Sequence, residues 1–181
     1  IAFLETLPPG TALARWSTFN EYTSVDSDID LYLYYCPNFS CTQIASSTNV
    51  DANESVEVLF PQNDPSINDP YLLFIHGFEI DDGLEEDEIL GLAADVFVFN
   101  HTIGVLDDAG NMTVSAPPSA TIGETTALEV QWSGLPSGPL SKQLGAISHS
   151  DASGLQDLTV INIENDAGFG LCDLGLLIGC E

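Results

Sequence analysis

The chain has 181 residues and a formal net charge of −26, and Arg15 and Lys142 are its only arginine and lysine. This balance excludes binding to nucleic acid or to an anionic membrane, because both are bound mainly through Lys and Arg. Hydrophobic residues make up 44% of the chain, so it can form a core and is not a disordered polyelectrolyte. The remaining partners are cations, neutral extracellular polymers such as glycans or peptides, and copies of the chain itself.

The first strands are predicted from apolar runs and period-two alternation. Residues 1–7 form an apolar segment that Pro8-Pro9-Gly10 ends, and 11–20 follows as a second strand. In the stretch 24–36, an acidic turn leads into a Tyr-rich strand with Ile29, Leu31, Leu33 and Tyr35 on one face. Alternation of this kind is typical of a half-buried strand. We therefore expect this strand to be the centre of a sheet.

Further strands are expected at 43–45, 56–60, 71–76 and 95–100. The segment 71–76 is apolar at nearly every position, which predicts a central strand covered on both faces and ended by Gly77. Its last residue, His76, is accordingly interpreted as a core histidine.

The second half of the chain continues the pattern, with strands expected at 111–116, 127–133, 144–148 and 158–163. Many short strands, frequent turn signals and almost no helical period predict an all-β protein. We expect a jelly-roll-like β-sandwich over residues 1–106 and a smaller immunoglobulin-like sandwich over 107–165. Residues 166–181 would form an apolar tail.

The four cysteines occur as two local pairs, Cys36 with Cys41 and Cys172 with Cys180. Four cysteines allow three pairings, of which the two local disulfides are the simplest. Neither spacing is that of a CxxC motif and no histidine lies near either pair, which argues against zinc and redox sites. Disulfides form in oxidising compartments, so the cysteines indicate an extracellular protein.

Eight segments of the chain form a distinctive combination: Gly10–Ala14, Phe19–Thr23, Asp28–Pro37, Ser40–Gln43, Phe74–Gly77, Asp108–Val114, Trp132–Leu135 and Leu144–Asp151. Together they resemble the C-terminal accessory region of secreted bacterial subtilisin-like serine proteases. The Asp-Leu-Tyr strand followed by the His-Gly strand is also similar to pre-peptidase C-terminal domains. The resemblance covers residues 8–164 and implies a non-catalytic β-rich appendage of a parent protease polypeptide, since the Asp, His and Ser motifs of the protease are absent. The first seven residues and the Cys172–Cys180 tail do not match.

Two acidic or polar clusters contain residue types that are used in catalysis or metal binding. Ser148-His149-Ser150-Asp151 contains the residue types of a hydrolase, but adjacent strand residues point to opposite faces and a triad needs groups that converge. We therefore expect no enzymatic activity. Asp26, Asp28 and Asp30 form an oxygen cluster that suits Ca²⁺, and the acidic loop 79–88 would contribute further carboxylates. A solvated acidic face is the alternative interpretation.

Two surfaces are candidates for binding. Tyr22, Tyr32, Tyr34 and Tyr35 would form an aromatic platform for sugars or collagen-like peptides, unless they only pack between strands.

The N-terminal strand is the other candidate surface. Its apolar residues Ile1, Phe3, Leu4 and Leu7 either cover an edge of the chain's own sheet or add to the sheet of another copy. The sequence thus predicts a non-enzymatic extracellular structural or binding module, with a subunit of a self-assembling filament or surface layer as the alternative.

Overall fold

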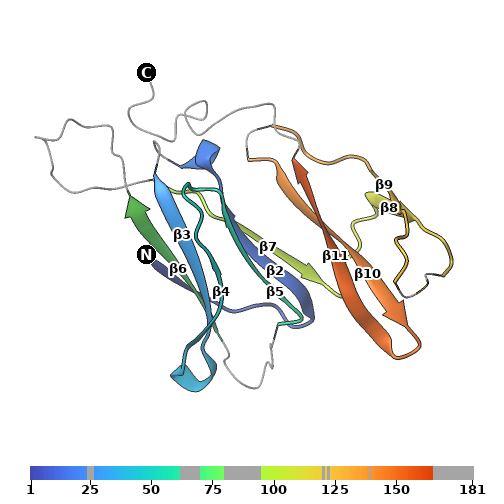
Figure 1. Cartoon of the computed structure of the whole chain (residues 1–181), viewed down its shortest axis with the longest axis horizontal. Helices are drawn as coiled ribbons and strands as arrows, with labels where there is room; N and C mark the ends of the chain where they lie inside the picture. Colours follow the sequence, from blue (N-terminus) through green and yellow to red (C-terminus); the bar gives the residue numbers. More distant parts are fainter. Residues whose placement is uncertain are drawn as a thin grey trace, which may run out of the picture. The chain divides into compact units, whose positions relative to one another are not determined.

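A computed structural model of the chain describes residues 1–23, 27–61, 70–79, 95–119, 121, 123–138 and 140–164 (Figure 1). The described part is all-β, as predicted, and its only helical segments are the short 3-10 turns η1 (Asn20–Tyr22) and η2 (Pro37–Phe39). None of its helices is long and apolar enough to cross a membrane. The chain divides between Val105 and Leu106 into two compact units, which are described separately.

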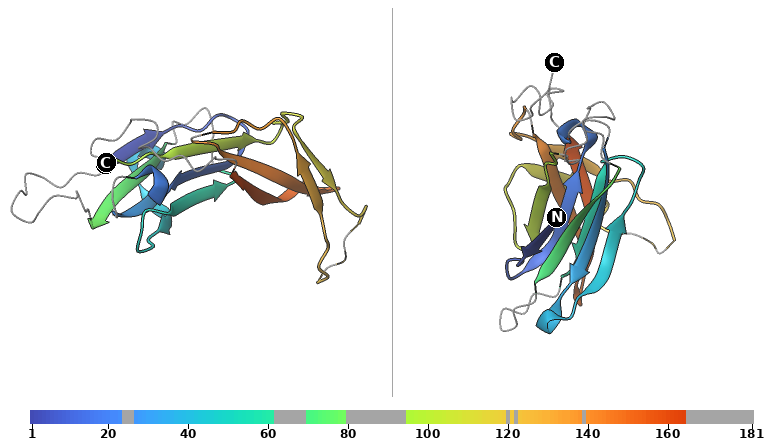
Figure 2. Two further views of the ribbon diagram at one scale, coloured as in Figure 1. Left: turned by 90° about the horizontal axis from the view of Figure 1, so that it is seen from above. Right: turned by 90° about the vertical axis from the view of Figure 1, so that its left-hand side faces the viewer.

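The first unit is a sandwich of two antiparallel sheets. One sheet has the strand order β1-β6-β3-β4 and the other β5-β2-β7. The strands are β1 (Ala2–Glu5), β2 (Thr11–Thr18), β3 (Asp28–Tyr35), β4 (Thr42–Ser47), β5 (Glu54–Leu59), β6 (Tyr71–Glu79) and β7 (Phe99–Gly104). Figure 2 shows β6, β3 and β4 side by side in its right-hand view. The predicted sandwich is thereby confirmed.

The core of this sandwich comes from alternate residues of facing strands. Ile29, Leu31 and Leu33 of β3 point inward and are almost fully buried, as the alternation predicts. They pack in one cluster with Trp16 of β2 and Val56 of β5, which belong to the opposite sheet. Burial of each large apolar side chain contributes about 1.5–3 kcal/mol, so this inner layer holds the two sheets together.

The second unit contains two antiparallel hairpins. Strands β8 (Met112–Ser115) and β9 (Glu129–Trp132) form the first, and β10 (Lys142–Asp151) and β11 (Gly154–Glu164) form the second. The turn between β10 and β11 is closed by Asp151, whose carboxylate accepts a hydrogen bond from the Ser153 backbone N–H at 2.7 Å. Gly154 follows with a φ of 117°, a conformation that favours glycine.

Strand β6 differs from the sequence prediction in two ways. It continues through Gly77 to Glu79, and only its inner residues Tyr71, Leu73 and Ile75 are buried. The strand is central, between β1 and β3, but it is not covered on both faces. Both faces of β6 carry apolar side chains, but only the inner face is covered by the opposite sheet. The outward side chains therefore remain accessible.

Strand β7 begins at Phe99, whereas the sequence predicted a strand at 95–100. Its position is fixed by pairing with β2, from Ser17 opposite Phe99 to Thr11 opposite Gly104. The apolar residues before β7 do not continue the strand. Val96 forms an isolated bridge to Thr23, and Val98 packs against the core.

The N-terminal strand lies on the chain's own sheet, where β1 pairs with β6. The pairing extends to Ile1, whose carbonyl oxygen accepts a hydrogen bond from the Ile75 N–H at 2.8 Å. Among the residues proposed for assembly, Leu7 belongs to the core, while Ile1, Phe3 and Leu4 are exposed. Asp26, residues 80–88 of the acidic loop, and the 166–181 tail with Cys172 and Cys180 lie outside the described residues.

We expect Leu7→Ala to lower the free energy of unfolding by about 2–5 kcal/mol, because Leu7 is only 6% exposed and its removal would leave a cavity. Leu4→Ala is the matched control, since Leu4 is 66% exposed and its loss should change stability by less than about 0.5 kcal/mol. Urea unfolding of the three proteins measures both values. Equal effects of the two substitutions would contradict the placement of Leu7 in the core and of Leu4 on the surface.

Candidate functional site

The outward residues of β3 and β6 form one surface. Antiparallel pairing places Asp30 opposite His76, Tyr32 opposite Phe74 and Tyr34 opposite Leu72, and such partners lie on the same side of a sheet. A bulge near the end of β6 leaves Phe78 without a partner on β3 and brings its ring within 6.4 Å of the His76 ring. We call the residues Tyr32, Tyr34, Phe74, His76 and Phe78 the aromatic face.

Three side chains of the aromatic face are well exposed, and four of its five rings lie close to one another, from Tyr32 through Phe74 and His76 to Phe78. Phe74 is 37% exposed, Phe78 is 70% exposed and the His76 side chain is 46% exposed. The Phe74 ring lies 6.3 Å from that of Tyr32 and 6.3 Å from that of His76, which it meets nearly in parallel with 16° between the planes. Aromatic pairs in this range stabilise one another, so the rings form a supported row along the sheet.

A hydrogen-bonded carboxylate lies beneath this row. Asp30 is only 6% exposed, and its Oδ2 accepts a hydrogen bond from the Tyr32 hydroxyl at 3.1 Å. The same oxygen lies 3.3 Å from Nδ1 of His76. The bond to Asp30 raises the pKa of Tyr32 above its ordinary value, because the phenol donates its proton to a negative charge.

The tautomer of His76 follows from this contact. A carboxylate accepts hydrogen bonds and has none to donate, so Nδ1 of His76 must carry the proton that the bond to Asp30 uses. In the neutral imidazole, Nε2 is then an acceptor. The interpretation of His76 as a core histidine is wrong, because its side chain lies on the exposed face of β6.

The four tyrosines predicted as a platform do not share one surface. Tyr32 and Tyr34 point outward, whereas Tyr22 is fully buried, with its ring 5.3 Å from that of Phe99. Tyr35 packs against the core with its ring 5.3 Å from that of Tyr71. Successive side chains on a strand point to opposite faces, so Tyr35 points toward the core and does not share the surface of Tyr34.

Phe74 and Phe78 were not predicted from the sequence to be surface residues. The signal was present, because Phe74-Ile-His-Gly-Phe78 has an aromatic side chain at every second position. The apolar residues between these aromatic positions obscured this signal, because a segment that is apolar throughout is interpreted as buried on both faces.

The predicted calcium residues are only partly described. Asp28 and Asp30 both belong to β3, and Asp30 is already bonded to Tyr32 and His76. Burial raises the pKa of Asp28 above its ordinary value, and the negative charges of Asp30 and Glu79 raise it further. Within the described ranges, no group of three or more His, Cys, Asp or Glu side chains is arranged to hold a metal ion. Calcium binding stays a prediction from the sequence.

A second buried carboxylate belongs to the opposite sheet. Glu54 begins β5 and is 1% exposed, with Oε1 accepting the Asn49 N–H at 2.5 Å. Its Oε2 makes no hydrogen bond to the described residues. Burial raises the pKa of Glu54 above its ordinary value, although hydrogen bonds from Ser47 and Asn49 oppose the shift.

The Ser148–Asp151 segment does not converge into a triad among the described residues. His149 Nε2 lies 2.7 Å from the Thr159 hydroxyl across the hairpin. Asp151 instead accepts hydrogen bonds from the backbone and hydroxyl of Ser153, which lower the pKa of its carboxyl group. The two groups are thus bonded to separate partners.

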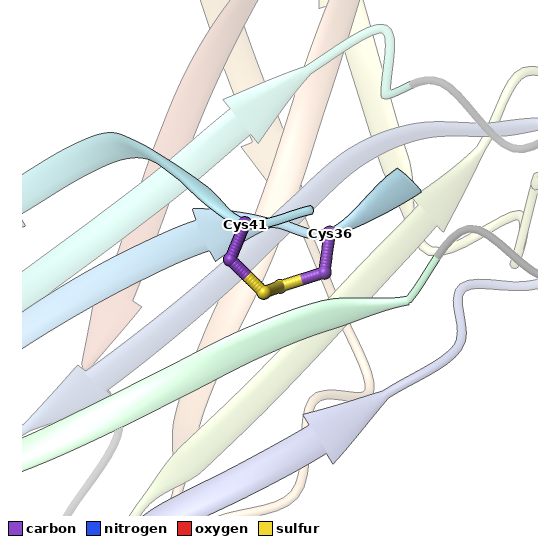
Figure 3. The surroundings of a disulfide bond; sticks show 2 residues. All are labelled: Cys36 and Cys41. Carbon is purple, nitrogen blue, oxygen red and sulfur yellow. A yellow bond between two sulfur atoms is a disulfide. The ribbon is translucent and has the colours of Figure 1, made fainter. Parts of the chain in front are cut away.

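Cys36 and Cys41 form a disulfide that closes the loop between β3 and β4 (Figure 3). The loop contains η2 and displays Phe39, which is almost fully exposed. Because β3 runs from Asp28 to Tyr35, this loop and Phe78 lie at opposite ends of the strand pair.

Comparisons with known protein families, with curated proteins and with solved structures found no match to this chain.

We expect Glu54→Gln to raise the melting temperature at about pH 7. A group with a raised folded-state pKa contributes stability that is fully present below its unfolded-state pKa, near 4.5 for this glutamate, and that is lost as the pH rises through the folded-state pKa. The gain should therefore shrink toward about pH 4, where Glu54 is increasingly protonated in wild type.

Glu124→Gln is the control, because Glu124 is exposed and its substitution changes the net charge equally. Calorimetric melting of the three proteins across this pH range provides the comparison. If both substitutions give the same pH-dependent gain in melting temperature, the raised pKa assigned to the buried Glu54 is wrong.

Proposed function

We propose that the chain is a non-enzymatic extracellular binding module, of the kind appended to secreted subtilases, and that it binds a neutral extracellular polymer through the aromatic face. The observation that carries the proposal is the row of accessible rings on β3 and β6. Exposed apolar residues are common singly, but contiguous exposed patches mark interaction sites.

The chemistry of the surface supports a neutral ligand. Arg15 and Lys142 are the only Lys and Arg residues, and they are bonded elsewhere, to Glu57 on β5 and to Glu164 on β11. No Lys or Arg thus belongs to the aromatic face, while the carboxylates of Asp28 and Glu79 lie close to it. An anionic polymer would be repelled, whereas an uncharged one would gain from burial against the rings.

The disulfide supports an extracellular location. A bond between Cys36 and Cys41 persists in oxidising compartments and is uncommon in the cytosol. The resemblance to protease appendages gives a role to such a module, because a polymer-binding unit keeps a tethered enzyme near an insoluble substrate. Linking in this way raises the effective concentration of the enzyme at the surface.

Assembly through strand addition is the alternative that the sequence left open. In the structure β1 pairs with β6 of its own chain, so the strand already has a partner. The aromatic face has none among the described residues, and for this reason we favour binding over filament formation.

The proposal predicts that the double variant Phe74→Ser/Phe78→Ser loses binding to insoluble neutral polymers by about tenfold or more, a change of about 1.4 kcal/mol. Cellulose, chitin and fibrous collagen are suitable solid phases for a depletion assay. Both rings are accessible, so the substitutions should leave the fold intact, which circular dichroism checks.

Phe39→Ser is the matched control, since it removes an exposed ring at the opposite end of the strand pair. It should bind as wild type does. Failure of wild type to bind any of the three polymers would disprove the proposal, and loss of binding in Phe39→Ser alone would move the site to the disulfide loop.

A further inference from the structure

We propose that the ligand of the aromatic face is a neutral glycan, with Nε2 of His76 as the acceptor for one of its hydroxyl groups and Asp30 as the residue that positions this acceptor. The inference rests on the proposed function and names the ligand class for the same surface. Three features of the face carry it: a fixed acceptor, flanking rings and the pattern of charge.

The acceptor is fixed by a buried group. Asp30 is 6% exposed, lies on the strand next to β6 and is itself held by the Tyr32 hydroxyl. Its contact with Nδ1 of His76 sets both the tautomer and the orientation of the ring. Carboxylates that hold the far nitrogen of a histidine perform the same task at metal sites, where they orient the ligating nitrogen. Here the oriented ring lies on the outward face of β6, and its side chain is 46% exposed.

The acceptor lies between two phenyl rings. Phe74 stacks beside His76 on one side, and Phe78 meets it at 70° on the other. The face of an aromatic ring carries negative charge density and attracts the electropositive C–H groups of a molecule that lies on it. A sugar ring presents a C–H face to such a surface and hydroxyl groups at its rim. One sugar unit would therefore contact the phenyl rings with its C–H face and the His76 acceptor with a hydroxyl group.

The charge around the site selects against charged glycans. Asp30 and Glu79 are near His76, and no Lys or Arg belongs to this sheet face. Uronic acids and sulfated sugars would meet only like charge there. Asp30 is only 6% exposed and its Oδ2 already contacts Tyr32 and His76, so it is not displayed for contact with a cationic sugar. The arrangement favours an uncharged chain.

The test is affinity electrophoresis of the whole chain through gels that contain one soluble polymer each. Hydroxyethyl cellulose, galactomannan and a neutral β-1,3-glucan probe the neutral glycans. Chitosan, pectin and gelatin represent a cationic glycan, an anionic glycan and a polypeptide. We expect retardation by at least one neutral glycan and not by pectin.

Two variants separate the acceptor from the rings. His76→Phe keeps an aromatic ring but removes the acceptor, and binding should weaken by about tenfold or more, as for the loss of a specific polar contact. Asp30→Asn should weaken binding less while lowering the fraction of His76 protonated on Nδ1, which ¹⁵N NMR of the imidazole reports. A merely structural role of Asp30 would leave that tautomer signal unchanged. His76 is exposed, so its variant keeps the test decisive even if Asp30→Asn fails to fold.

The outcomes are distinguishable from those of the proposed function. Retardation by gelatin with no effect of any neutral glycan would overturn the glycan inference and leave the binding module intact. Stronger, salt-sensitive retardation by chitosan would overturn it in favour of recognition by charge. Wild-type affinity in His76→Phe would overturn the role of the acceptor. No retardation by any polymer would disprove both proposals.

Discussion

The pairing of β3 with β6 is the interaction on which the rest of the first unit depends. It places Leu31 opposite Ile75 and Leu33 opposite Leu73 on the inner side, where they join the core. The same register sets Tyr32 opposite Phe74 on the outer side. A slip of one residue would turn every side chain of one strand to the wrong face, so the core and the aromatic face are specified together.

The inner and outer layers of this sheet are built under different constraints. Inward residues satisfy the hydrophobic effect and are closely packed, as Leu31 and Leu33 are. Outward residues contribute little to folding, yet the chain places Phe74 and Phe78 there, where polar side chains would improve solubility. The buried Asp30 adds the desolvation of a carboxylate beneath them. Costs of this kind are typical of surfaces that are retained for binding.

Much of the fold was predictable from the sequence, because alternation records which face of a strand is buried. The strand at Asp28–Tyr35 is the clearest case, since its apolar residues recur at every second position. β6 was harder, because both its faces are apolar and period alone cannot tell a covered face from a binding face. His76 was misassigned for that reason, and its partner Asp30, predicted as a metal ligand, lies on a strand distant in sequence. Contacts between such strands depend on register, which a single sequence does not specify.

The central claim is that the outward residues of β3 and β6 form the binding surface of the chain. Its most direct test is an NMR titration of the isotope-labelled protein with soluble oligomers of a neutral polymer, with ring and amide signals followed together. The account predicts shift changes that cluster on Tyr32, Phe74, His76 and Phe78 and are small in the second unit. Changes centred on the Phe39 loop or on β10 and β11, or no changes at all, would contradict it.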